Sequence, residues 1–220
     1  MKNLVALEST IKLPLLKLPV CSVFASLRAG RILISPGSKL DSIQLKSLGK
    51  VSDIIAPNLF HSGGINQAAQ IFPEAKIWGP RGAAKLKPHI KWTAELSNQN
   101  WPYQTELPML ELRGMPKINE CVFIHLESKT LILTDLAFNL TKTEGFGAKL
   151  IFSMFGTYKK FATSRIFMSH VKDRTEFSNS LSELFKYDFA NIILSHGESI
   201  HGQAKERLRK ALFERDIHIS

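Results

Sequence analysis

Short apolar runs alternate with turn residues and helical spacings along the first part of this chain. Runs at 4–8, 23–27, 31–35, 51–56 and 75–78 are rich in β-branched and aromatic residues and predict strands. The segment 28–30, which ends in a glycine, separates two of them and predicts a hairpin. Apolar residues at helical spacing predict helices over 41–48, where Ser38 or Asp41 would be the cap, and over 65–72.

The second half repeats this alternation of strands and helices. Residues 81–106 are polar and predict a loop with one short helix, and 107–112 resume an extended pattern. Strands at 120–126 and 130–135 form the clearest hairpin, and the second is apolar enough to be buried on both faces. An apolar segment at 148–155, a helix at 173–185, a strand at 190–195 and a basic amphipathic helix at 203–213 follow.

Length and composition favour a single α/β domain over residues 1–220. Hydrophobic residues make up 44% and charged residues 22%, which excludes a disordered chain. Cys21 and Cys121 are far apart and indicate buried thiols in a reducing compartment. No segment is long enough to span a membrane, and Glu8, Lys12 and Lys17 interrupt any signal-peptide core, so we expect a cytoplasmic protein.

The formal net charge of +10 raises nucleic acid as a partner. The densest basic cluster belongs to the last helix, where Glu206, Glu214 and Asp216 are interleaved with the cations. Neither an RNA-binding aromatic signature nor zinc-finger spacing accompanies it. A solvated helix face is therefore favoured, and nucleic acid remains an alternative. The oligomeric state is not indicated.

Three side chains that can act in catalysis or bind a metal follow directly after predicted buried strands. They are His61, Asp135 and His196. Each has a plain alternative, because a lone histidine can hydrogen-bond a turn and a lone aspartate can cap a helix. Strand ends converge on one rim of an α/β sandwich, so we expect the three to meet there.

The same positions resemble motifs of the metallo-β-lactamase superfamily. The loop after the strand at 51–56 places His61, Gly63 and Gly64 where the family has the last histidine of H-x-H-x-D-H and a Gly-Gly pair. Asp135 resembles the aspartate that bridges two metals, and His196 the final histidine. The resemblance covers most of the chain and implies a four-layer αββα sandwich that holds a metal-dependent hydrolase site.

The chain departs from the family at the other metal positions. Ala56, Asn58 and Phe60 replace ligands, and the segment 114–119 lacks the histidine of the G-H-T-P-like turn. What remains implies a reduced, mononuclear site in which His61, Asp135 and His196 bind one divalent zinc, iron or manganese ion. The substrate would be a small molecule that the sequence does not name.

Two further residues receive candidate catalytic roles. Asn58 would orient the substrate or stabilise an oxyanion, and Glu120 would point toward the site and act as a base from behind the metal ligands. The alternative is a metal-free scaffold that binds a small molecule or a protein, which Phe60 favours because an apolar ring near a metal repels water.

The remaining candidates receive simpler interpretations. His125 is expected on a sheet face, and the other histidines on the surface, with His201 near enough to His196 to enter the rim. The apolar residues at 152, 154 and 155 are expected in the core, with a roof over the pocket as the alternative.

Overall fold

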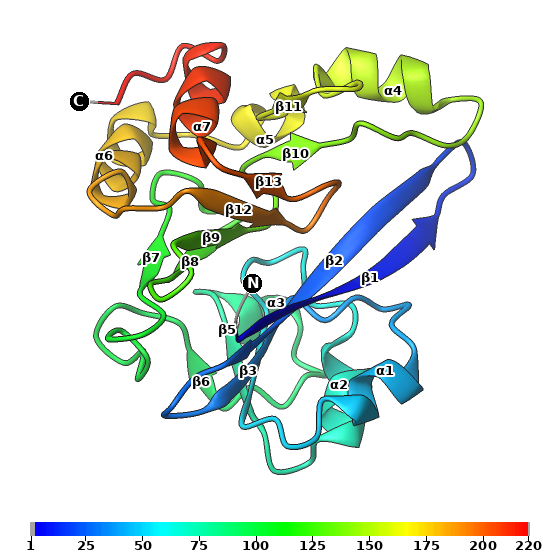
Figure 1. The fold of residues 1–220 in the computed structure, drawn as a ribbon, viewed down its shortest axis with the longest axis vertical. Helices are drawn as coiled ribbons and strands as arrows, with labels where there is room; N and C mark the ends of the chain where they lie inside the picture. The colour runs from blue at the N-terminus through cyan, green and yellow to red at the C-terminus, as the bar shows by residue number, and fades with distance from the viewer. Residues whose placement is uncertain (1–2, 220) are drawn as a thin grey trace.

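The computed structural model describes residues 3–219 and arranges them as two β-sheets packed face to face, with helices outside both (Figure 1). The first sheet has the strand order β1-β2-β3-β4-β5-β6. Strands β1, β2 and β3 pair antiparallel, and β3 to β6 pair parallel. The bounds are β1 Leu4–Lys12, β2 Lys17–Ser26, β3 Arg31–Ile34, β4 Asp53–Ile55, β5 Lys76–Gly79 and β6 Ala94–Glu95.

The second sheet has the order β13-β12-β9-β8-β7, and only β9 and β12 run parallel in it. Its strands are β7 Met109–Glu111, β8 Cys121–His125, β9 Thr130–Leu133, β12 Asn191–Leu194 and β13 Ile200–His201. A separate two-stranded ribbon pairs β10 Phe138–Asn139 with β11 Phe161–Ala162. The predicted hairpins β2–β3 and β8–β9 are confirmed.

Helices cover the outer faces of both sheets, as Figure 1 shows with α1 and α2 below and α6 and α7 above. The bounds are α1 Ser42–Ser47, α2 Ile65–Ile71, α3 Ala83–Leu86, α4 Ala148–Phe155, α5 Arg165–Ser169, α6 Arg174–Leu184 and α7 Ala204–Phe213. Asp41 caps α1 by accepting a hydrogen bond from the Ile43 N–H, as the sequence predicted for this residue or Ser38.

Alternation along the central strands produces the layers. In β12, Ile192 and Leu194 pack toward helices α6 and α7, whereas Ile193 faces the other sheet. In β4, Ile54 faces α1 and α2 and Ile55 faces inward. Because successive side chains of a strand point to opposite faces, a strand that is apolar at every position needs cover on both sides. The result is the predicted four-layer αββα sandwich.

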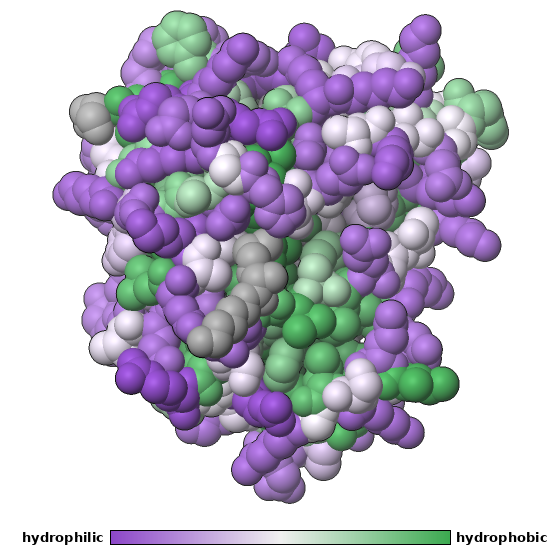
Figure 2. Space-filling model, in the orientation of Figure 1, coloured by the Kyte–Doolittle hydropathy of each residue, from purple (hydrophilic) through white to green (hydrophobic). Residues whose placement is uncertain are grey.

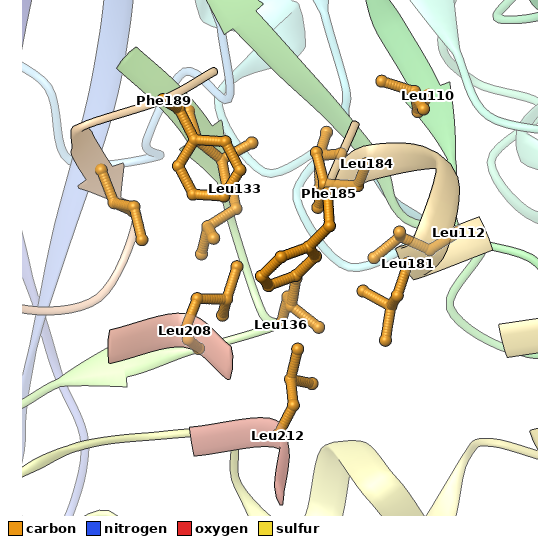
Figure 3. Close-up of a cluster of buried hydrophobic side chains, with 14 of the residues drawn as sticks. Leu110, Leu112, Leu133, Leu136, Leu181, Leu184, Phe185, Phe189, Leu208 and Leu212 are labelled. Atoms are coloured by element: carbon orange, nitrogen blue, oxygen red, sulfur yellow. The ribbon is translucent and has the colours of Figure 1, made fainter. Parts of the chain in front are cut away.

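Helices α6 and α7 pack on the second sheet through leucine and phenylalanine side chains (Figure 3). Leu181 and Leu184 of α6 and Leu208 and Leu212 of α7 are fully buried. Burying such a side chain contributes roughly 1.5–3 kcal/mol. This cluster fixes the helices against the strands that lead into the candidate site.

The β1–β2 hairpin differs most from the sequence prediction. It runs far beyond residue 8 and turns at residues 13–16, and Figure 1 shows it reaching toward the loop before α4. There the Lys17 N–H donates to the Glu144 carbonyl, and the Gly147 N–H donates to Leu15. Pro19 lies inside β2, opposite Thr10 of the edge strand β1.

Most of the face drawn in Figure 2 is hydrophilic, with a hydrophobic area beside the β1–β2 hairpin and α1. In α4, Phe152 is buried as expected, but Met154 is 59% exposed, so its predicted place in the core is wrong. An apolar residue on the outer side of a short helix has no neighbour to cover it. No helix among residues 3–219 has the length and apolar character to cross a membrane.

The basic residues of α7 lie partly over aromatic rings of the same chain. The guanidinium of Arg209 lies 4.7 Å from the centre of the Phe185 ring, and that of Arg207 lies 5.5 Å from Phe161. Arg215, beyond the helix, donates from Nε to the Thr163 carbonyl. These cations therefore stabilise the packing of their own helix and its neighbours.

Candidate metal centre

Two of the three candidate side chains follow neighbouring parallel strands. The register of β9 and β12 pairs Leu133 with Leu194. Asp135 and His196 each lie two residues beyond that pair, so the two strands deliver them to the same edge of the sheet. The Ser195 N–H donates to the Leu133 carbonyl and keeps the two strand ends together.

His61 comes from the other sheet, in the loop between β4 and α2. Two backbone hydrogen bonds tie that loop to the second sheet: Leu59 donates to Ile118, and Cys121 donates to Pro57. His61 Nε2 thereby lies 3.4 Å from Asp135 Oδ2 and 3.3 Å from His196 Nε2. His196 Nε2 lies 3.5 Å from Asp135 Oδ1. The structure therefore brings together all three residues that the sequence singled out.

The far nitrogen of each imidazole is held by a protein oxygen. His196 Nδ1 lies 2.9 Å from the Pro19 carbonyl, to which it can only donate, so its Nε2 carries the lone pair in the neutral ring. His61 Nδ1 lies 2.8 Å from Ser35 Oγ. The His196 ring also stacks on Phe138, with centroids 5.1 Å apart and planes at 6°. Both Nε2 atoms are thus directed toward Asp135.

Ser35 was missed by the sequence analysis. It directly follows β3, and its backbone has a φ of +53°, which is uncommon for a residue other than glycine. The Ile55 carbonyl accepts from its N–H and holds it in that conformation. Its position directly after an apolar strand, shared with the other site residues, was the available signal. Local backbone strain of this kind is concentrated at functional sites.

Asp135 and His196 shift each other's pKa. Burial opposes ionisation of Asp135, but the charges and hydrogen bonds of His61 and His196 outweigh it and hold the pKa of Asp135 well below its usual range. Burial likewise opposes protonation of His196, and the hydrogen bond and charge of Asp135 raise its pKa nonetheless. The site therefore concentrates one negative charge between two basic nitrogens.

Asn58 lies behind the cluster with its side chain fully engaged. Its Nδ2 donates to Thr134 Oγ1 at 3.0 Å and to Asp135 Oδ2 at 2.8 Å. Its Oδ1 accepts from the backbone N–H groups of Phe60 and His61, both at 2.9 Å. It is fully buried and does not line the cavity, so the expected contact with substrate is replaced by contacts with site residues.

Glu120 is also fully buried, beneath the turn that carries Asp135. Its carboxylate accepts hydrogen bonds from the backbone N–H groups of Thr134, Asp135 and Leu136. Burial, together with the charge of Asp135, raises the pKa of Glu120 to about 7. Like Asn58, Glu120 does not line the cavity. It holds the turn that carries Asp135 and does not point toward the substrate site, where it was expected as a base.

A cavity of about 390 Å³ opens beside the three side chains, within the range of small-molecule sites. Phe60 lies at it with 58% of its surface exposed, near the ring of His170. His170, expected on the surface, thus belongs to the cavity, whereas His201 is exposed in β13 and does not line it. The lining residues are Ile11, Leu18, Val20, Ser35, Pro36, Gly37, Ser38, Phe60, His61, Gly63, Ile118, Asp135, Phe138, Ser164, Ile166, Phe167, His170 and His196.

The donor atoms lie close enough together to hold one metal ion. Bonds of about 2.0–2.1 Å at tetrahedral angles place neighbouring ligand atoms about 3.3 Å apart. The two Nε2 atoms are 3.3 Å apart, and each lies 3.4–3.5 Å from a different oxygen of Asp135, Oδ2 for His61 and Oδ1 for His196. One ligand atom from each of the three residues lies within 4.8 Å of the other two. Both imidazoles have the oriented Nδ1 contacts that accompany metal ligation. Three such ligands leave a fourth position for water or substrate.

The remaining predictions concern one histidine and the two cysteines. His125 is buried on β8 with its Nδ1 2.7 Å from Ser128 Oγ, as expected for a sheet-face residue. Cys21 and Cys121 are free and buried, and burial raises the pKa of the Cys21 thiol to about 12.

No protein-family model and no curated protein matches this sequence. Solved structures do share its fold. A metallo-β-lactamase from Pontibacter korlensis is 13% identical, with a TM-score of 0.66 over 97% of this chain and 96% of that one. The rubredoxin oxygen:oxidoreductase from Desulfovibrio gigas is 10% identical, with a TM-score of 0.68 over 98% of this chain and 60% of that one. The metal-soaked Flv1 flavodiiron core from Synechocystis sp. PCC6803 is 14% identical, with a TM-score of 0.66 over 96% and 58%. The protein therefore has the metallo-β-lactamase fold, as the resemblance of its loops predicted.

Proposed function

We propose that the protein is a hydrolase that uses one divalent metal ion held by His61, Asp135 and His196. The observation that carries this proposal is that one ligand atom from each of the three residues lies within 4.8 Å of the other two, with both Nδ1 atoms fixed by other partners. Zinc, iron and manganese all accept two imidazoles and a carboxylate. Metal-binding proteins of the same fold support it.

A divalent ion at this position would lower the pKa of a water molecule and polarise a carbonyl or phosphoryl oxygen. The side chains around it orient the site. Asn58 holds one oxygen of Asp135 and the backbone of the His61 loop, and Glu120 holds the turn that carries Asp135. We therefore assign positioning roles to Asn58 and Glu120, in place of the catalytic roles expected from the sequence.

The single-metal stoichiometry follows from the surroundings of Asp135. In the metallo-β-lactamase superfamily, the aspartate that Asp135 resembles bridges two metals. Here the neutral amide of Asn58 donates a hydrogen bond to Asp135 Oδ2 at 2.8 Å and occupies that side of the carboxylate. Ala56 offers no ligand atom, and its side chain is fully buried. One metal ion is therefore what the remaining donors support.

The test is the metal content of protein purified without chelator. Wild-type protein should contain about one transition metal per chain, and His196→Ala and Asp135→Asn should contain much less. His89→Ala is the matched control, because His89 is exposed and does not line the cavity. Zinc at 100 times its dissociation constant should stabilise the wild type by about 2.7 kcal/mol. Metal-free protein that gains no stability from zinc, iron or manganese would refute the proposal.

A metal-free binding scaffold is the second candidate. The observation that favours it is the ionised Asp135 between two imidazoles, because a protonated His196 can pair with that carboxylate in place of a metal ion. The exposed Phe60 ring at the cavity would then contact a small molecule or a protein partner directly. Wild-type protein without metal, and a loss of stability in His196→Gln as the partner of Asp135 is removed, would support this candidate.

A further inference from the structure

The wall of the cavity beside the candidate metal centre is mostly apolar. Leu18, Val20, Ile118, Phe138 and Phe167 contribute to it from four different segments of the chain. Apart from the three candidate metal ligands, the polar side chains at this wall are three serines and His170. Two of the serine hydroxyls already serve the protein, since that of Ser35 contacts His61 and that of Ser164 accepts from the Phe167 N–H.

Lysine and arginine side chains of the described residues are absent from this wall although the protein is strongly basic. The chain has 29 lysines and arginines and a formal net charge of +10, yet no described lysine or arginine lines the cavity. Arg165 begins the helix that contributes Ile166 and Phe167, but its Nη1 donates to the Met154 carbonyl instead. An anionic group entering this cavity would lose water without gaining a charged partner from the wall.

Two large apolar side chains at the cavity are themselves exposed to solvent. Phe60 is 58% exposed and Ile166 is 46% exposed, and both belong to the lining. A ligand with an apolar chain would cover them and gain roughly 25 cal/mol for each Å² removed from water. The position of these residues beside the candidate metal centre aligns such a chain with the reacting group.

We propose that the cavity selects an uncharged substrate with an apolar chain, of the class of neutral alkyl esters, and excludes phosphodiesters and other anions. The identity of the reaction rests on the proposed hydrolase function; the preference for an uncharged chain rests on the cavity wall alone. In the reaction, water adds to the acyl carbon, the carbon–oxygen bond to the alcohol breaks, and the products are a carboxylic acid and an alcohol.

The binding arm of the test uses metal-free protein, so it does not depend on activity. Octanamide and octyl phosphate carry apolar chains of seven and eight carbons with a neutral and an anionic head, so chain length favours the phosphate, and ligand-detected NMR compares their affinities. Wild-type protein should bind octanamide at least fivefold more tightly than octyl phosphate, and Phe60→Ala should weaken octanamide binding several-fold. Equal or tighter binding of octyl phosphate, or binding of neither ligand, would overturn the inference.

The second arm uses metal-loaded protein and the p-nitrophenyl esters of acetate, butyrate and octanoate, with bis(p-nitrophenyl) phosphate as the anionic substrate. Each added methylene should raise kcat/KM about two- to fourfold while the chain stays inside the cavity. Ile166→Lys should shift the ratio of phosphate to ester hydrolysis toward the phosphate by tenfold or more. Ile43→Lys adds the same charge at an exposed position outside the cavity and should leave the ratio unchanged.

The two arms separate the two ideas. Octanamide binding without hydrolysis of any ester would reject the hydrolase and retain the preference of the cavity. Hydrolysis of the phosphate in preference to every ester would retain the hydrolase and reject the preference.

Discussion

Replacement of Asn58 by alanine should weaken both the fold and the candidate metal centre. The side chain makes four hydrogen bonds, to Thr134, Asp135 and the backbone of Phe60 and His61, and is fully buried. At about 1 kcal/mol each, with a further penalty for buried groups left without a partner, the loss is about 3–5 kcal/mol. A domain of this kind has roughly 5–15 kcal/mol in total, so the variant should fold but lie near its limit.

Asn58→Ala should also lower the affinity for the metal, by more than a general loss of stability would. Asn58 fixes one oxygen of Asp135 and the loop of His61, and removal of such a supporting contact typically lowers metal affinity 10–100-fold. Urea unfolding of metal-free protein measures the first effect. Competition with a chromophoric chelator measures the second.

Asn191→Ala is the matched control. Asn191 Nδ2 donates to the Ser128 carbonyl and its Oδ1 accepts from the Gly202 N–H, so the control also loses hydrogen bonds, at the opposite end of β12 from His196. It should lower stability by about 1–2 kcal/mol and leave metal affinity unchanged. If both variants reduce metal affinity equally, or if Asn58→Ala reduces it less than threefold, the positioning role of Asn58 is refuted.

Three other substitutions test the fold. Burial lowers the pKa of His125, so the unfolded chain binds a proton there more readily and the protein loses stability as pH falls below about 6.5. Urea unfolding at pH 7 and pH 5 should show a smaller loss of stability in His125→Gln than in the wild type. An equal loss in both would contradict this cause. Gly114 has a φ of +77° and a Cβ there would overlap the Asp173 backbone oxygen, so Gly114→Ala should lower the melting temperature by many degrees, and an unchanged value would show that the turn can shift. Leu181→Ala should cost about 2–5 kcal/mol in urea unfolding, whereas Leu150→Ala, at 74% exposure, should cost under 1 kcal/mol, and similar losses would contradict the assigned packing.

The sequence alone determined the order of elements and the residues of the candidate centre. Short, β-branched apolar runs such as Ile192-Ile193-Leu194 predict strands that are covered on both faces, and the layers follow from that requirement. His61, Asp135 and His196 were predictable because each directly follows such a run. The rule that strand ends meet at one edge accounts for Asp135 and His196, whereas the packing of the two sheets brings His61 to them.

Tertiary structure alone decided what these side chains contact. Asn58 and Glu120 carry the same polar groups whether they face a cavity or a backbone turn, and only the packing of two sheets directed them inward. His170 reaches the site through the fold of distant segments, so no local pattern marks it, and the position of Ser35 after a strand did not show that it contacts His61. The charge of the chain is spread along its sequence, and only the folded surface excludes every described lysine and arginine from the cavity, because burial is a property of neighbours in space.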